Sequence, residues 1–144
     1  MRKDTNGQEM RVLIADDSAV IAQRLATMLA DMDGIDIVGH AATVAEASRA
    51  VRILKPDVVI LDLRMPGGSG IDVLESMKRD RVTPIVIVLT NYQYPQYREK
   101  CLRSGARFFM DKSTEFEKVG AVLRGLIRNA SIEPEDRHDH SDRE

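Results

Sequence analysis

The stretch Val58-Val59-Ile60-Leu61-Asp62 is an apolar run that ends in a carboxylate. Continuous apolar runs flanked by amphipathic segments are typical of buried parallel strands. Three further runs also end in polar side chains: residues 12–15 before Asp16 and Asp17, 85–89 before Thr90, and 108–110 before Asp111 and Lys112. Ligands of an open α/β sheet bind beyond the carboxyl ends of its strands. The sequence therefore predicts one pocket, lined by carboxylates, a hydroxyl and an ammonium group, that can hold a divalent cation and a phosphoryl group.

Strands and helices alternate along the chain as five βα units. We predict strands at residues 12–15, 35–38, 57–62, 84–90 and 106–110, each followed by an amphipathic helix. Ser18 and Thr43 are predicted to cap the first two helices, and Thr114 with Glu117 to form a capping box for the fifth. Short connections and right-handed crossovers favour the α/β class. We expect a flavodoxin-like, doubly wound, five-stranded parallel sheet in the order 2-1-3-4-5, with five helices.

Composition limits the domain organisation and the classes of partner. A chain of 144 residues suits one domain, which we place at residues 10–130, between a flexible arm at 1–9 and a disordered acidic tail at 131–144. The net charge of −2 argues against nucleic-acid and membrane-surface binding. No apolar run is long enough to cross a bilayer. The single cysteine, Cys101, agrees with a reducing cytoplasm, where we expect the protein to act.

The residue types at the predicted strand ends suit phosphoryl transfer. Asp16, Asp17 and Asp62 can offer a few oxygen ligands to Mg²⁺, which usually keeps several waters and binds phosphate as well. A carboxylate beside that cation can attack phosphorus and form an acyl phosphate, while Lys112 and Thr90 offer a positive charge and a hydroxyl donor. The plain alternative is that each acid only caps a helix and that Lys112 is a solvated cation. All five residues at the appropriate strand ends are harder to explain in that way.

These residues belong to a motif set that resembles a known family. Asp16-Asp17-Ser18, the run from Val58 to Gly67, Leu89-Thr90 and Asp111-Lys112-Ser113 are similar to the receiver domain of two-component response regulators. The similarity extends from about residue 10 to 130, and it implies the same flavodoxin-like fold.

The resemblance implies a role for each residue. Asp62 corresponds to the phosphoacceptor. Asp16 and Asp17 correspond to the acidic pair that binds Mg²⁺, Asp17 directly and Asp16 through water, and the backbone carbonyl of Arg64 to the main-chain ligand. Thr90 corresponds to the switch hydroxyl, Lys112 to the phosphate-binding lysine and Phe109 to the switch aromatic. Two positions depart from the common pattern, because Ser113 stands where many members have a proline in a cis peptide and Phe109 lacks the hydroxyl of the frequent tyrosine.

The resemblance further implies a stand-alone signalling switch that catalyses only its own phosphorylation and dephosphorylation. A histidine kinase or histidine phosphotransfer protein would load Asp62, and an unidentified downstream protein would bind the face formed by helix four, strand five and helix five. Arg64 and Tyr92 stand two residues after the acceptor and the switch hydroxyl, and neither is suited to orient a hydrolytic water. We therefore expect slow autodephosphorylation. His40, at the end of the second strand, is expected to be structural and away from the pocket.

Three alternatives stay open at this stage. The first is a metal-dependent phosphatase that acts through an aspartyl phosphate, although Arg64 stands where such enzymes have a second acid and the chain is too short for a cap domain. The second is an interaction module that is never phosphorylated. The third is a receiver cut from a longer DNA-binding response regulator, although no helix-turn-helix can follow residue 130 in this chain.

Overall fold

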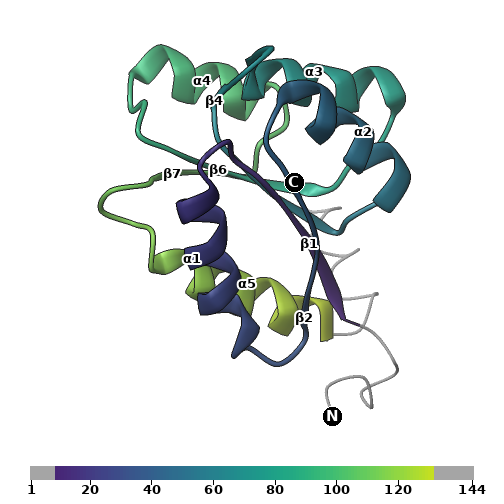
Figure 1. Cartoon of the computed structure of the whole chain (residues 1–144), viewed down its shortest axis with the longest axis vertical. Coiled ribbons are helices and arrows are strands. Elements are labelled where there is room, and N and C mark those ends of the chain that lie inside the picture. Colours follow the sequence, from purple (N-terminus) through teal and green to yellow (C-terminus); the bar gives the residue numbers. More distant parts are fainter. Residues whose placement is uncertain (1–8, 132–144) are drawn as a thin grey trace, which may run out of the picture.

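A five-stranded parallel sheet runs through the centre of the molecule (Figure 1), in a computed structural model that describes residues 9–131. The order of its strands is β2-β1-β3-β6-β7. Numbered among the sheet strands alone this is 2-1-3-4-5, so the predicted flavodoxin-like topology is confirmed. The strands are β1 Met10–Ala15, β2 Ile35–Ala41, β3 Val58–Leu61, β6 Ile85–Thr90 and β7 Phe108–Asp111.

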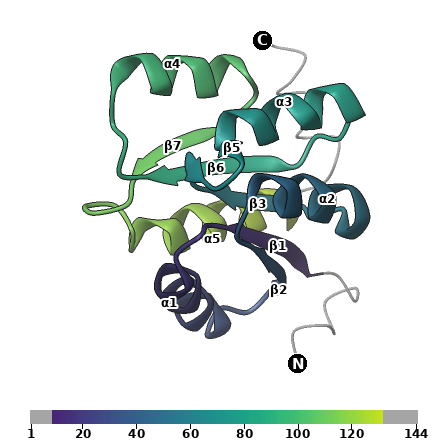
Figure 2. The same cartoon turned by 45° about the horizontal axis from the view of Figure 1, so that its top comes forward.

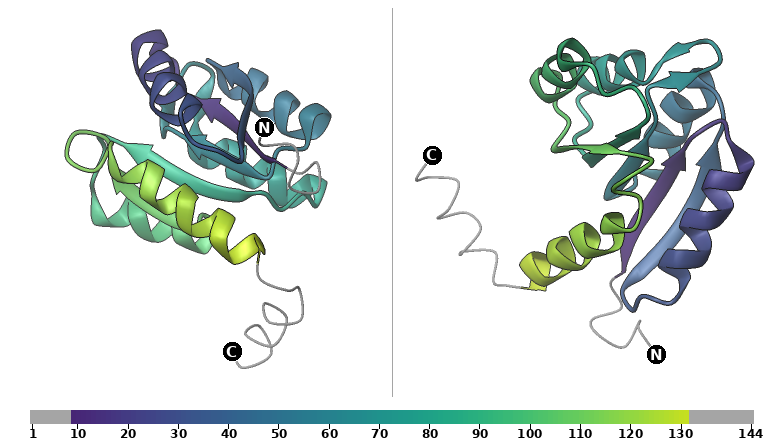
Figure 3. Two further views of the ribbon diagram at one scale, coloured as in Figure 1. Left: turned by 90° about the horizontal axis from the view of Figure 1, so that it is seen from below. Right: turned by 90° about the vertical axis from the view of Figure 1, so that its left-hand side faces the viewer.

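Five helices cover the two faces of this sheet. On one face lie α2 (Val44–Leu54), α3 (Gly70–Asp80) and α4 (Pro95–Arg103), as Figure 2 shows. On the other lie α1 (Ala19–Ala30) and α5 (Lys118–Ser131), which face the viewer in the left view of Figure 3. Successive residues of the central strands pack on opposite faces of the sheet: Val59 packs in the α2–α3–α4 layer and Val58 in the α1–α5 layer. Both faces of each central strand are therefore buried, which is why these strands are continuously apolar.

Local sequence signals set the starts of most helices. The Ser18 hydroxyl accepts the N–H of Ile21 at 3.2 Å, and the Thr43 hydroxyl accepts the N–H of Glu46 at 3.1 Å, which confirms both predicted caps. Ser69 and Asp72 form a complete capping box for α3. The sequence reading missed this Ser-x-x-Asp signal, although its pattern is recognisable in the chain.

The predicted capping box at Thr114 and Glu117 is wrong, because α5 begins at Lys118. The Asp111 carboxylate instead accepts the N–H groups of Ser113 at 2.8 Å and Thr114 at 3.4 Å, which folds this segment into turns. A side chain at the end of β7 therefore competes successfully with the helix for these donors.

Most strand boundaries differ from the predictions by one or two residues, and three differences are larger or change the element. The second strand continues to Ala41 rather than to residue 38. The connection between β3 and α3, for which no strand was predicted, contains a short antiparallel hairpin of β4 (Arg64–Met65) and β5 (Gly68–Ser69), whose turn uses the positive φ of Gly67. Ser131, expected in the tail, is the last residue of α5.

Most of both predicted terminal segments, at residues 1–8 and 132–144, lies outside the described residues. Among residues 9–131, no helix has the length and apolar character needed to cross a membrane.

Candidate functional site

Three acidic side chains meet at the carboxyl end of the sheet. One carboxylate oxygen from each of Asp16, Asp17 and Asp62 lies within 4.8 Å of the others. Strand register produces this arrangement, because Ala15 of β1 pairs with Leu61 of β3 and the acids follow immediately. The backbone N–H of Asp62 donates to the carbonyl oxygen of Ala15 at 2.9 Å, which fixes the two strand ends at one level. The structure thus brings together the three acids that the sequence singled out.

A lysine joins this group from across the sheet. The Lys112 Nζ lies 2.8 Å from Asp16 Oδ2 and 2.9 Å from Asp62 Oδ2. Lys112 also donates its backbone N–H to the carbonyl oxygen of Thr90 at 2.9 Å, and Thr90 itself is fully buried at the end of β6. The predicted ammonium group therefore contacts two of the acids directly, and Thr90 is hydrogen-bonded to the main chain of the same lysine.

Burial and charge act against each other at these groups. Loss of hydration raises the pKa of Asp16, and the hydrogen bond from Lys112 only partly opposes this. Burial alone would lower the pKa of Lys112, but its hydrogen bonds to Asp16 and Asp62 outweigh that effect and raise it. Lys112 is therefore firmly cationic at neutral pH. One ammonium group faces three carboxyl groups here, so a further cation is favourable.

One oxygen of the site is left without a partner. The Oδ1 atom of Asp62 is buried and accepts no hydrogen bond from any described residue, while Oδ2 is held by Lys112. A buried acceptor without a partner is costly unless a ligand or ion completes it. Since Asp16, Asp17 and Asp62 present only carboxylate oxygens, the ligands that hard cations prefer, the residues fit Mg²⁺.

Two side chains near the carboxyl end of the sheet, Arg64 and Tyr92, contact each other. The Arg64 Nη1 donates to the Tyr92 hydroxyl at 2.5 Å, and the guanidinium group lies 5.4 Å from the centre of the Tyr92 ring. The main chain of Arg64 lies in β4, two residues after Asp62. Arg64 and Tyr92 thus connect the segment after β3 with the segment after β6.

Phe109 lies in β7 and is buried in the layer formed by α2, α3 and α4. The guanidinium of Arg98, in α4, is 5.9 Å from the centre of its ring. The predicted switch aromatic therefore occupies an inward position in this structure and contacts α4 through Arg98.

His40, which was expected to be structural, lies near the end of β2 and contacts the main chain of Asp16. Its Nε2 atom is 2.7 Å from the backbone carbonyl oxygen of Asp16, across the β1–β2 pair. Because β2 is longer than predicted, His40 is level with Ile14 and can reach the residue that follows Ala15. Extending the predicted alternation of strand residues as far as Ala41 would have placed His40 beside the end of β1.

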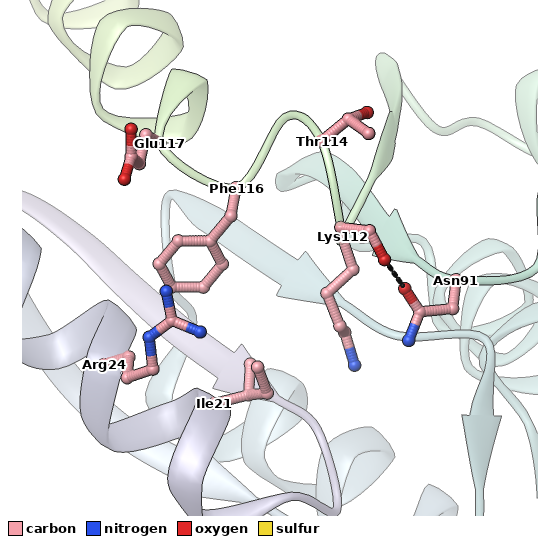
Figure 4. Close-up of a pocket in the computed structure, with 8 residues that line it drawn as sticks. Ile21, Arg24, Asn91, Lys112, Thr114, Phe116 and Glu117 are labelled. Atoms are coloured by element: carbon pink, nitrogen blue, oxygen red, sulfur yellow. Dashed lines mark hydrogen bonds between the residues drawn. The ribbon is translucent and has the colours of Figure 1, made fainter.

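A pocket of about 380 Å³ opens beside Lys112 (Figure 4). Its walls come from α1, from the start of the β6–α4 connection and from the β7–α5 connection. Within it the Arg24 guanidinium lies 4.4 Å from the centre of the Phe116 ring. The lining residues are Ile21, Arg24, Asn91, Lys112, Ser113, Thr114, Phe116 and Glu117.

Comparison with known proteins gives consistent results. The family model described as response regulator receiver domain matches residues 12–124. The transcriptional regulatory protein YhcZ of Bacillus subtilis is 36% identical over 110 residues, which cover 76% of this chain and 51% of that protein. The chain spans about half the length of the curated relatives it matches.

Two solved structures share both fold and sequence similarity. The response regulator domain of Thermotoga maritima CheB has a TM-score of 0.74 at 30% identity, covering 88% of this chain and 100% of that one. A chain of the CheX–CheY–BeF3–Mg²⁺ complex from Borrelia burgdorferi has a TM-score of 0.69 at 29% identity, covering 82% and 92%.

Proposed function

Because this chain belongs to the response regulator receiver domain family, we propose that it is a phosphorylation-dependent switch of a two-component system that accepts a phosphoryl group on Asp62. Receiver domains are signalling domains, and membership of this family confirms the resemblance found in the motifs. The folded unit of this switch would be the receiver domain predicted at residues 10–130.

The observation that carries the proposal is the asymmetry of the Asp62 carboxylate. Lys112 holds Oδ2 at 2.9 Å, while Oδ1 is buried and has no partner among the described residues. Asp62 is therefore oriented with one oxygen ready to attack phosphorus. The new Oδ1–phosphorus bond forms as the bond from phosphorus to the donor's histidine nitrogen breaks, and the departing electron pair stays on that nitrogen.

The other site residues hold the transferred group. Asp16, Asp17, Asp62 and the carbonyl of Arg64 would bind Mg²⁺, which supplies positive charge that offsets the charge of the phosphoryl oxygens. Lys112 is already at the acceptor and adds a second positive charge.

The Thr90 hydroxyl oxygen accepts the N–H of Tyr92 at 3.2 Å, so its own hydrogen is available for a phosphoryl oxygen. We propose that turning of Thr90 toward the phosphoryl group is the start of the switch. Phe109 would respond through packing alone, since it has no hydroxyl.

We infer that the phosphorylated form is long-lived. Hydrolysis needs a water in line with the Asp62–phosphorus bond. Arg64 and Tyr92 are bonded to each other at 2.5 Å, and neither offers an acid or amide to orient that water. The joined pair supports the predicted slow autodephosphorylation. Replacing Arg64 with Asn and Tyr92 with Glu should speed the loss of phosphorylated mass over time, and equal or slower loss in the double variant would remove the support.

The partners follow from the same proposal. A histidine kinase or histidine phosphotransfer protein would supply the phosphoryl group, and a downstream protein would bind the α4–β7–α5 face. The buried, unpaired thiol of Cys101 agrees with a reducing cytoplasm, where we propose that the switch operates. The relatives favour a second candidate, a receiver that is joined to a DNA-binding output domain, since YhcZ is a transcriptional regulatory protein about twice as long as the matched segment.

Phosphorylation with a small donor tests the acceptor directly. Acetyl phosphate with Mg²⁺ should give a phosphorylated mass that is lost in base, and chelation of Mg²⁺ should prevent it. Asp62→Asn should abolish the modification, whereas Asp36→Asn, which changes an exposed acid in β2, should leave it intact. Unchanged labelling of the Asp62 variant, measured by intact mass, would falsify the assignment.

A further inference from the structure

The two residues that follow Thr90 and Lys112 are bonded to each other. Asn91 comes directly after Thr90, and Ser113 comes directly after Lys112. The Ser113 hydroxyl donates to Asn91 Oδ1 at 2.9 Å, the contact drawn as a dashed line in Figure 4. A side-chain bond therefore links the β6–α4 connection to the β7–α5 connection beside the pocket that contains Lys112.

The serine side of this link is itself held in place. The backbone N–H of Ser113 donates to Asp111 Oδ1 at 2.8 Å, so a residue of β7 fixes the turn that carries the serine. Among residues 9–131 there is no cis peptide bond, so Ser113 follows Lys112 through a trans bond. Ser113 thus offers Asn91 an anchor that is continuous with β7.

Hydrogen bonds to main-chain carbonyl oxygens hold the ends of β6 and β7 together. The N–H of Lys112 donates to the Thr90 carbonyl oxygen at 2.9 Å. The Gln93 side-chain amide donates to the same oxygen at 2.8 Å and to the Met110 carbonyl oxygen at 3.2 Å. These bonds fix the main chain at the strand ends, whereas the Asn91–Ser113 bond lies beyond them, in the loops themselves.

We propose that Asn91 and Ser113 are a positioning pair that sets the distance between the Thr90 hydroxyl and the Lys112 ammonium group. Two donors bind the oxygens of one phosphoryl group well only when the distance between the donors is already fixed before the phosphoryl group binds. Neither Asn91 nor Ser113 contacts the acceptor, so both act through their neighbours. The inference rests on the proposed function, because it assumes that Thr90 and Lys112 bind phosphoryl oxygens.

The location of the pair separates phosphoryl binding from metal binding. Asp16, Asp17 and Asp62 follow β1 and β3, whereas the pair joins the loops after β6 and β7. Breaking the Asn91–Ser113 bond should therefore weaken binding of a phosphoryl analogue and leave Mg²⁺ affinity unchanged. Both residues are exposed, so their replacement by Ala should leave the fold and the urea midpoint intact.

The test is calorimetric titration of the whole chain with beryllofluoride in Mg²⁺, and with Mg²⁺ alone. Ser113→Ala and Asn91→Ala should each weaken beryllofluoride binding about three- to tenfold, the range expected for loss of one hydrogen bond. The double variant should match the single ones, since one shared bond is lost in all three. Ser113→Thr keeps the hydroxyl and should bind as wild type does. Thr114→Ala, which removes a neighbouring exposed hydroxyl from the same pocket, is the matched control and should have no effect.

Several outcomes would overturn the inference. Unchanged or tighter beryllofluoride binding in the alanine variants would do so, as would an equal loss of Mg²⁺ affinity or additive losses in the double variant. If wild type binds beryllofluoride and Asp62→Asn does not, failure of the alanine variants to weaken binding removes only the positioning pair. If wild type binds none, the proposed function fails and this inference fails with it.

Discussion

The helices α3 and α4 (Figure 2) both follow strands that end at the site, yet they differ in how many of their side chains are buried against the rest of the protein. α3 comes after β3 and Asp62, and it begins with the Ser69–Asp72 capping box. Its buried residues are Gly70, Val73, Leu74, Ser76 and Met77. α4 comes after β6 and Thr90, and its only buried residue is Cys101. The residue at its N-cap, Tyr94, makes no side-chain capping bond.

This difference assigns different tasks to the two sides of the site. A helix with several buried side chains and a satisfied N-terminus needs much free energy to move, whereas a helix held by one buried side chain needs little. The segment after Asp62 is therefore fixed, and the segment after Thr90 can shift. We expect a signal that starts at Thr90 to displace α4 and to leave α3 in place.

Truncating one leucine in each helix tests whether α3 is packed more firmly than α4. Leu74 in α3 is fully buried, and Leu74→Ala should lower the free energy of unfolding by about 3 kcal/mol. Leu102 in α4 is 40% exposed, and Leu102→Ala should cost less than about 1 kcal/mol. Urea denaturation measures both. Equal losses would show that α4 is packed as firmly as α3.

Adding a methyl group at the first residue of α3 should show how closely that helix packs against the main chain of Asp62. A Cβ atom at Gly70 would lie 2.4 Å from the carbonyl oxygen of Asp62. Gly70→Ala should therefore cost about 2 kcal/mol, because backbone must move to admit it.

Gly125, in α5, is the control for this methyl group, since a Cβ atom there meets nothing within 4 Å. Gly125→Ala should gain up to about 1 kcal/mol through helix propensity. An unchanged free energy of unfolding for Gly70→Ala, measured by urea denaturation, would mean that α3 can move away from Asp62.

Thiol labelling should give a smaller but more local measure. Burial raises the pKa of Cys101 from its ordinary 9.0 to about 11, so at pH 8 the folded thiol is protonated and reacts only when α4 opens. Because the folded thiol holds its proton more tightly than the unfolded one, this group's contribution to stability is complete below pH 9.0 and is lost as the pH rises toward 11.

The comparison sample for labelling carries Ser76→Cys with Cys101→Ala, which moves the single thiol to the buried face of α3. We expect Cys101 in wild type to be alkylated about tenfold faster at pH 8, since local opening of α4 should cost less than that of α3. Alkylation of both thiols at one rate would show that the two helices open together.

The layers, the strand order of the sheet and the meeting of the acidic side chains could all be predicted from the chain alone. The central strands are buried on both faces, so their apolar runs are visible without any structure. Asp16, Asp62 and Lys112 directly follow or end such strands, and parallel topology then places them together. The signals that failed were weaker ones, such as the capping box predicted for the fifth helix, where the Asp111 side chain accepts the N–H groups of Ser113 and Thr114 instead.

Only the tertiary structure decided which exposed polar side chains pair around the site. Arg64 and Tyr92 are 28 positions apart, and Ser113 and Asn91 are 22 apart. Such residues have no hydrophobic periodicity, and each could equally be solvated, so no pattern in the chain marks their partners. His40 reached the Asp16 carbonyl for a similar reason, since two further residues of strand pairing brought it level with β1. Burial is encoded residue by residue along the chain, whereas contacts between loops depend on the final positions of the strand ends from which those loops depart.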